Sequence, residues 1–282
     1  MISVKIAGVP EHFNLPWHLA IEEGAFLDRG IDLEWTDVPE GTGRMCQMLR
    51  DGETDIAIIL TEGIIKDIIA GNPSKIAQVY VKSPLVWGIH VAAHSEHKTI
   101  HDLEGKTAAI SRLGSGSHLM SYVNAQQQNW DLKKLQFEIV NNLDGGVQAL
   151  KEGTADYFMW ERFTTKPLVD NGTFRKVSDC PTPWPCFVIA VRNDFNHHHN
   201  SVLKHILEII NIYTTDFKNI PSIDRTLANT YSQKLSDINE WLKITHWGQE
   251  NITAAMVEKT QDHLLQLDLI NKKLDFDAIV TK

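Results

Sequence analysis

The residues best suited to chemistry in this sequence are two serines that alternate with glycines and are followed by a histidine. They lie in the segment SRLGSGSH, residues 111–118, between an apolar run and a predicted helix. Glycines at the start of a helix let backbone N–H groups approach an anion. A serine near a histidine could instead form a nucleophile and its base. The segment therefore allows a phosphate loop, a nucleophile turn or a binding site for another polar molecule.

The catalytic and nucleotide-binding interpretations fit the sequence poorly. A P-loop needs Gly-x4-Gly-Lys-Ser/Thr, and residues 111–118 contain no lysine. The segment also lacks the Gly-x-Ser-x-Gly pattern of a nucleophile elbow, although Ser115, His118 and Asp144 could still form a hydrolase triad. VPEHFN stands where a dinucleotide-binding protein has Gly-x-Gly-x-x-Gly. We therefore predict a binding protein with no catalytic residue.

Similar polar or glycine-containing loops follow the other predicted strands. Examples are PEHFN (10–14), PEGTGR (39–44), TEG (61–63) and WERF (160–163). In open α/β sheets, ligands bind beyond the carboxyl ends of the strands. Trp17, Trp87, Trp160 and Trp184 could add flat apolar walls. The candidate ligand-binding residues are His12, Phe13, Asn14, Gly41, Thr42, Gly43, Thr61, Glu62, Arg112, Ser115, Gly116, Ser117, His118, Trp160, Glu161 and Trp184.

Composition excludes several classes of partner. The chain has 282 residues and a net charge of -9 without a basic run, which argues against nucleic acid. The sequence contains no stretch of 18 apolar residues, so membrane insertion is not predicted. Cys46, Cys180 and Cys186 form no CxxC pair, so neither a disulfide framework nor a zinc site is predicted. We interpret His197-His198-His199 as part of a solvated polar loop, and expect neither a metal nor a cofactor.

The N-terminal residues MISVKIAGV predict a strand rather than a secretory signal. We therefore expect a cytoplasmic protein. The alternative is a periplasmic protein whose leader is missing from this sequence.

Predicted strands and helices alternate along the chain, which indicates a parallel sheet with helices on both faces. The first part has strands at 2–8, 31–36, 55–60 and 75–82. A helix from Pro16 to about Arg29 and helices at 43–51 and 62–70 separate them. The middle has strands at 106–111, 135–140 and 155–159, with helices at 116–129 and 146–152. The last third is helical near 200–215, 223–233 and 253–267.

An internal repeat indicates two lobes of similar construction. MLRDGETDIAI (48–58) and ALKEGTADYFM (149–159) both predict a helix that ends at a glycine and turns into a strand. We expect lobe 1 to comprise residues 1–90 and 192–282, and lobe 2 to comprise residues 91–191. LVWGIHVAA and PCFVIAVRN would be the two crossover segments of a hinge.

Three segments in order resemble a known superfamily: NLPWHLAIEEGAFLDRGIDLEW (14–35), GTGRMCQMLRDGETDIAI (41–58) and DLEGKTAAISRLGSGSH (102–118). They are similar to type 2 periplasmic binding proteins, in the branch that includes sulfonate, nitrate, taurine and thiamine-pyrimidine-precursor binding proteins. SRLGSGSH, WERFTTKPLVDNG and PTPWPC look like a narrower subgroup of this fold. The resemblance implies an α/β, two-lobed clamshell with a hinge of two crossover segments.

The resemblance also implies a function. A small anionic or zwitterionic molecule, such as a sulfonate or a thiamine-type pyrimidine precursor, would bind between the lobes and pass to the permease of an ABC importer. Asn14, Gly41 to Gly43, Thr61, Ser115 to Ser117 and Glu161 occupy the positions of ligand contacts. The CCCFC stretch of thiamine pyrimidine synthases is missing here, which argues against that enzymatic role. The alternative is a cytoplasmic enzyme or sensor of thiamine-pyrimidine metabolism on the same scaffold.

Overall fold

The computed structural model describes residues 1–281 and divides into two compact units. Unit 1 comprises Met1–Ser83 and the chain from Trp184 onward, and unit 2 is Pro84–Pro183. The boundaries expected from the sequence, after residues 90 and 191, lie later than those of the structure. The physical reason is that the two strands next to the crossings each belong whole to one sheet, so the chain changes unit before each strand begins.

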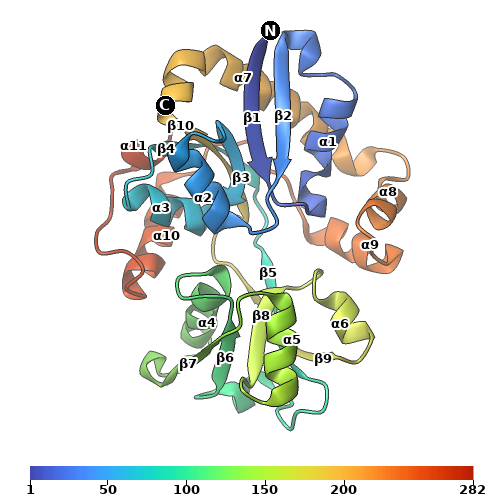
Figure 1. Cartoon of the computed structure of the whole chain (residues 1–282), viewed down its shortest axis with the longest axis vertical. Helices are drawn as coiled ribbons and strands as arrows, with labels where there is room; N and C mark the ends of the chain where they lie inside the picture. Colours follow the sequence, from blue (N-terminus) through green and yellow to red (C-terminus); the bar gives the residue numbers. More distant parts are fainter. Residues whose placement is uncertain (282) are drawn as a thin grey trace. The chain divides into compact units, whose positions relative to one another are not determined.

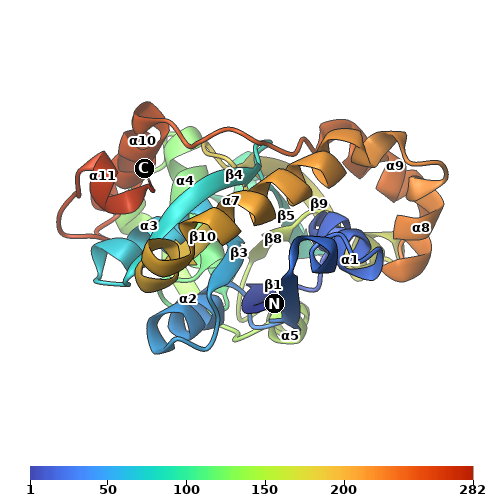
Figure 2. The ribbon, with the colours of Figure 1, turned by 90° about the horizontal axis from the view of Figure 1, so that it is seen from above.

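Unit 1 is built on a five-stranded sheet in the order β2-β1-β3-β10-β4. Its strands are β1 (Ile2–Gly8), β2 (Ile31–Asp37), β3 (Ile56–Leu60), β4 (Ser74–Val81) and β10 (Phe187–Arg192). Its helices are α1 (Leu15–Glu22), α2 (Thr42–Asp51), α3 (Thr61–Ile69), α7 (Asn193–Asp216), α8 (Ile223–Thr230), α9 (Leu235–Ile244), α10 (Ala254–Gln266) and α11 (Phe276–Ile279). Helices α2 and α3 contact β3 and β10, and the long α7 packs on β10, β4 and α1 (Figures 1 and 2).

Unit 2 repeats this plan with a second five-stranded sheet, in the order β7-β6-β8-β5-β9. Its strands are β5 (Val86–Ala92), β6 (Thr107–Ile110), β7 (Gln136–Ile139), β8 (Tyr157–Glu161) and β9 (Phe174–Pro181). Its helices are α4 (Gly116–Gln127), α5 (Leu143–Glu152) and α6 (Lys166–Asp170). An added Cβ at Gly146 of α5 would stand 2.9 Å from the Phe158 ring, so this glycine lets α5 pack closely on the sheet.

Both sheets are mixed, whereas the sequence predicted parallel ones. Strand β10 is antiparallel to β3 and β4, and β5 is antiparallel to β8 and β9. Each of these strands is the first to follow a crossing between units. Neither strand is reached through the right-handed strand–helix–strand connection that makes neighbouring strands parallel, so each can enter its sheet in the opposite direction.

The internal repeat corresponds to the same local structure in both units. Gly52 and Gly153 end α2 and α5 in the left-handed conformation, at φ 73° and 74°. Three residues after Gly52, Oδ2 of Asp55 accepts a 3.0 Å hydrogen bond from the Lys5 amide in β1. Oδ2 of Asp156 accepts the equivalent bond from the Thr107 amide at 2.8 Å. The repeated glycine and aspartate therefore perform one structural role twice.

Two local predictions were wrong. The helix expected from Pro16 to about Arg29 ends at Glu22, because Gly24 adopts a φ of 74° that breaks it. His197 to His199 lie within α7 rather than in a polar loop, and the helix is kinked at His199, where φ is -129°. Helix α9 was not predicted. No helix in the described chain has the length and apolar character needed to cross a membrane.

Candidate ligand-binding site

The candidate residues of unit 1 follow the carboxyl ends of three parallel strands. Asn14 follows β1, Gly41 follows β2, and Thr61 begins α3 directly after β3. The N-termini of α2 and α3 lie side by side, because an ideal Cβ at Gly63 would stand 2.3 Å from Cγ2 of Thr42. Unit 1 thus presents two adjacent helix N-termini at one edge of its sheet, where backbone N–H groups favour anionic atoms.

The loop before α2 uses glycine for a conformational reason. Gly41 is the N-cap of α2, with φ 77° and ψ -155°, a conformation that L side chains rarely adopt. Thr42 and Gly43 form the first turn that follows. An ideal Cβ at Gly41 would meet no other atom within 4 Å, so backbone geometry alone requires the glycine.

His12 and Phe13 belong to a buried aromatic cluster. The His12 ring centroid lies 4.3 Å from that of Trp241 in α9, and the Phe13 centroid lies 5.2 Å from it. Burial lowers the pKa of His12 to about 3, so the imidazole is neutral at physiological pH. The Phe13 carbonyl accepts a 2.8 Å hydrogen bond from the Tyr80 hydroxyl. These contacts give both residues a packing role at the end of β1.

Asn14 is buried, and only one of the two polar atoms of its side chain has a hydrogen-bond partner in the described chain. Its Nδ2 donates a 2.8 Å hydrogen bond to the Val9 carbonyl, which fixes the orientation of the amide. Its Oδ1 is buried and has no hydrogen-bond partner among residues 1–281. A buried acceptor without a partner is energetically unfavourable, so Oδ1 is a natural contact for a ligand donor or an ordered water.

Thr61 and Glu62, the first two residues of α3, each bind the returning chain through a hydrogen bond. Oγ1 of Thr61 donates to the Pro185 carbonyl at 2.6 Å, and Nε1 of Trp184 donates to Oε2 of Glu62 at 2.6 Å. Burial raises the pKa of Glu62 to about 7. The Trp184 ring also packs edge-on against His263 of α10. The three predicted residues therefore attach the segment that returns from unit 2 to the start of α3.

The candidate serines of unit 2 surround the N-terminus of α4. Oγ of Ser115 accepts a hydrogen bond from the His118 amide at 3.3 Å and is the N-cap of the helix. It also lies 3.1 Å from Oγ of Ser117, which accepts from the Ser111 amide at 2.9 Å. The hydroxyl groups are thus joined in a buried network around the first turn, and Ser111 is a member that the sequence analysis missed.

Gly116, the first residue of α4, has an aromatic neighbour. An ideal Cβ there would stand 2.9 Å from Cη2 and 3.1 Å from Cζ2 of Trp87 in β5. Only a glycine therefore leaves room for the indole edge at this place. The sequence analysis expected Trp87 to supply an apolar wall and did not include it among the candidate ligand-binding residues.

His118 and Arg112 differ in their surroundings. The His118 ring is buried between Tyr122 and Phe137, with centroid distances of 5.1 and 4.7 Å. Its Nδ1 accepts a 3.0 Å hydrogen bond from the Gly114 amide. Arg112 is exposed in the loop before α4. The hydrolase triad gains no support, since Ser115 contacts the backbone of His118 and Asp144 is exposed in α5.

Trp160 and Glu161 are the remaining candidate ligand-binding residues of unit 2. The Trp160 ring stacks on Phe158 at 5.2 Å and packs against the small core beneath α5. Glu161 is paired with Trp87 in the β5–β8 register, and Oε2 accepts hydrogen bonds from the Thr164 amide and hydroxyl at 2.7 and 2.9 Å. Burial raises the pKa of Glu161. Trp160 and Glu161 are neighbours in the sequence, but they lie on opposite faces of the sheet because side chains alternate along a strand.

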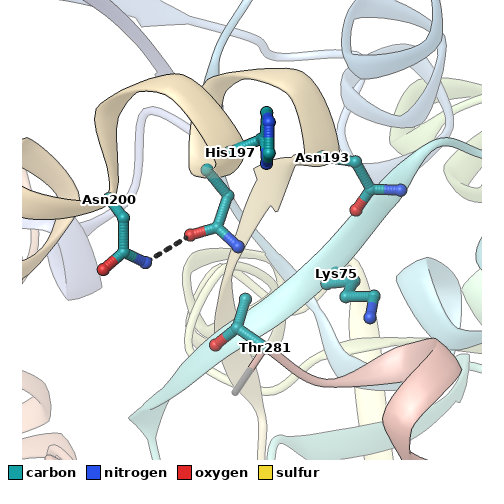
Figure 3. Close-up of a pocket in the computed structure, with 6 residues that line it drawn as sticks. Lys75, Asn193, His197, Asn200 and Thr281 are labelled. Carbon is teal, nitrogen blue, oxygen red and sulfur yellow. Dashed lines mark hydrogen bonds between the residues drawn. The ribbon is translucent and has the colours of Figure 1, made fainter.

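None of the candidate ligand-binding residues lines a separate hollow of about 430 Å³ in unit 1 (Figure 3). It is lined by Lys75, Asn193, Asn196, His197, Asn200 and Thr281. Nδ2 of Asn200 donates to Oδ1 of Asn196 at 3.0 Å, within the same helix. Among the described residues, no group of three His, Cys, Asp or Glu side chains could hold a metal ion.

Two α/β units with these strand orders, polar helix N-termini and two chain crossings define the type 2 periplasmic binding protein fold, and this chain has that fold. Residues 87–180 match the family model described as Ca3427-like PBP. No curated protein sequence is significantly similar to the chain.

Several solved structures are similar in fold to this protein over almost the whole chain. The Candida albicans CA3427 gene product, which has the generic periplasmic binding protein fold, is 27% identical with a TM-score of 0.89, covering 100% of this chain and 97% of that one. The periplasmic aliphatic sulphonate binding protein SsuA from Escherichia coli is 17% identical, with a TM-score of 0.80 and coverages of 100% and 92%. The alkanesulfonate-binding protein SsuA from Xanthomonas axonopodis pv. citri, bound to MOPS, is 14% identical, with a TM-score of 0.82 and coverages of 99% and 98%.

Proposed function

We propose that this protein is a solute-binding protein for a small organic molecule with an anionic group, of the sulfonate or thiamine-type pyrimidine precursor kind. The observation that carries the proposal is the buried hydroxyl network of Ser111, Ser115 and Ser117 around the N-terminus of α4. Hydroxyl groups and helix amides together favour an anionic or strongly polar ligand. The similarity to two sulfonate-binding proteins supports the same class of ligand.

The functional state we propose is one in which the ligand engages polar loops of both units. Such binding would shift the population toward a closed form, because only that form makes every contact. The role is binding and delivery rather than catalysis, and the physiological partner would be the permease of an ABC importer.

Thermal unfolding with separate panels of sulfonates, aminopyrimidines and carboxylates tests this function. A true ligand at about 100 times its dissociation constant adds about 2.7 kcal/mol of stability. Calorimetric titration then compares the wild type with Ser115→Ala, which should bind more weakly. Ser201→Ala, on an exposed position of α7, is the matched control and should bind like the wild type. The proposal would be contradicted if no compound in the panels raised the unfolding temperature.

The import role has its own test. Fractionation of the native host should place the protein in the periplasm if it serves an ABC importer. A strictly cytoplasmic location would favour the alternative proposal of a sensor or enzyme of thiamine-pyrimidine metabolism on the same scaffold.

A further inference from the structure

We propose that Trp87 and the first turn of α4 form an oxyanion subsite, in which the indole N–H and the amides of Gly116 and Ser117 donate to the ligand. The inference rests on the proposed function and deepens it, because it assigns the anionic end of the ligand to unit 2. It also names a specificity-determining residue, Trp87, which lies far from SRLGSGSH in the sequence.

The first argument is the position of the indole. Trp87 is 6% exposed, and its Cζ2–Cη2 edge lies against Gly116, the first residue of α4. Nε1 is bonded to the ring carbon next to Cζ2, so the N–H group belongs to the same side of the indole as the edge that packs against Gly116. Nε1 is buried and has no hydrogen-bond acceptor in the described part of the chain. Native proteins rarely leave a buried donor unsatisfied, which indicates that something else supplies the acceptor.

The second argument is the set of amides beside the indole. Oγ and the carbonyl of Ser115 accept hydrogen bonds from the amides of His118 and Leu119. The preceding amides, of Gly116 and Ser117, have no acceptor within residues 1–281. They are the first donors of a helix of 12 residues, and they lie at the positive end of its dipole. Three N–H donors without an acceptor in the described chain thus belong to Gly116, to the next residue and to the indole packed against Gly116.

The third argument is the polarity of the surroundings. The hydroxyl groups of Ser115 and Ser117 can rotate to donate, whereas the N–H groups only donate. The one buried carboxyl group paired with Trp87 is Glu161, and its Oε2 is held by the amide and hydroxyl of Thr164. Burial raises the pKa of Glu161 and so favours its uncharged form. Acceptor-only oxygens, such as those of a sulfonate or carboxylate, fit this subsite, and an ammonium group does not.

The test uses the full-length protein with methanesulfonate, acetate and methylammonium as probes. The wild type should bind at least one of the two anions and should not bind methylammonium. Trp87→Phe keeps an aromatic ring but removes the N–H, and should weaken anion binding about tenfold or more, since hydrogen bonds to charged groups contribute that much. Gly116→Ala should also weaken binding, because the new Cβ displaces the indole. Trp130→Phe, a buried tryptophan elsewhere in unit 2, is the matched control and should bind normally.

A spectroscopic readout separates hydrogen bonding from packing. In ¹H–¹⁵N spectra the indole N–H of Trp87 should move downfield when the anion binds, and the signal of Trp130 should stay in place. Wild-type affinity in Trp87→Phe, or an unmoved Trp87 signal in the bound protein, would overturn the subsite while leaving the proposed function intact. If the wild type binds a pyrimidine but neither anion, the subsite is also wrong. If no ligand of any class binds, the proposed function itself fails.

Discussion

Nε1 of Trp184 donates a 2.6 Å hydrogen bond to Oε2 of Glu62, and so joins the first residue of the returning chain to the first turn of α3. The adjacent Thr61 hydroxyl binds the Pro185 carbonyl. Both side chains of the pair are almost fully buried, at 2% and 3% exposure. Residues that the sequence analysis assigned to the ligand therefore also hold the polypeptide where it re-enters unit 1. Separating these two roles requires variants that change one atom group at a time.

Glu62→Gln should change the pH dependence of stability. Burial raises the folded-state pKa of Glu62 from 4.5 to about 7, so the folded protein binds the proton more tightly than the unfolded chain does. This contribution to stability is fully present below the unfolded pKa and is lost as pH rises through the folded pKa. It amounts to on the order of 3 kcal/mol.

Urea unfolding at about pH 5 and about pH 8 measures the effect. The wild type should lose more stability between the two values than Glu62→Gln does. Equal losses in the two proteins would show that Glu62 does not titrate in this range.

Trp184→Phe should destabilise unit 1 by about 1–3 kcal/mol, because Oε2 of Glu62 loses its donor inside the protein. Chemical denaturation measures the loss. Adding Glu62→Leu to Trp184→Phe should cost less than the sum of the two single changes, since both remove the same hydrogen bond. Strict additivity would mean that the bond contributes nothing to stability.

Gly63→Ala should destabilise the protein by about 1–3 kcal/mol through overpacking, because its Cβ would stand 2.3 Å from Cγ2 of Thr42. Thr42→Ser removes that methyl group and keeps the hydroxyl. The double variant should regain much of the lost melting temperature. A double variant no more stable than Gly63→Ala would show that α2 and α3 do not meet through these two residues.

Ser115→Ala should leave any background turnover of p-nitrophenyl acetate unchanged. Oγ of Ser115 accepts from the His118 amide and so serves as a helix cap. Removal of that cap should lower stability by about 1 kcal/mol. Ester hydrolysis is measured at about 400 nm in samples of equal folded fraction. Hydrolysis by the wild type that disappears in Ser115→Ala would instead restore the hydrolase hypothesis.

The strand and helix order was largely predictable, and the reason is local. The apolar run IAIIL forms the buried β3, and Gly52 and Gly153 end two helices in the left-handed conformation that favours glycine. The start of α4 at Gly116 also follows from SRLGSGSH, because a serine N-cap acts on amides two or three residues away. The direction of β5 and β10 was not predictable in this way, since it depends on where the chain enters each sheet.

The sequence by itself determined the alternating elements, the repeated Gly–Asp turn and the polar loops at the strand ends, because these depend on neighbouring residues and on side-chain periodicity. Only the tertiary structure decided which loop residues are packed and which retain a free hydrogen-bonding atom. Phe13 and Trp160 pack against aromatic rings, while Oδ1 of Asn14 and Nε1 of Trp87 remain without a partner among the described residues. Those outcomes depend on contacts such as that of Trp87 with Gly116, between residues that chain folding brings together and that no local pattern connects.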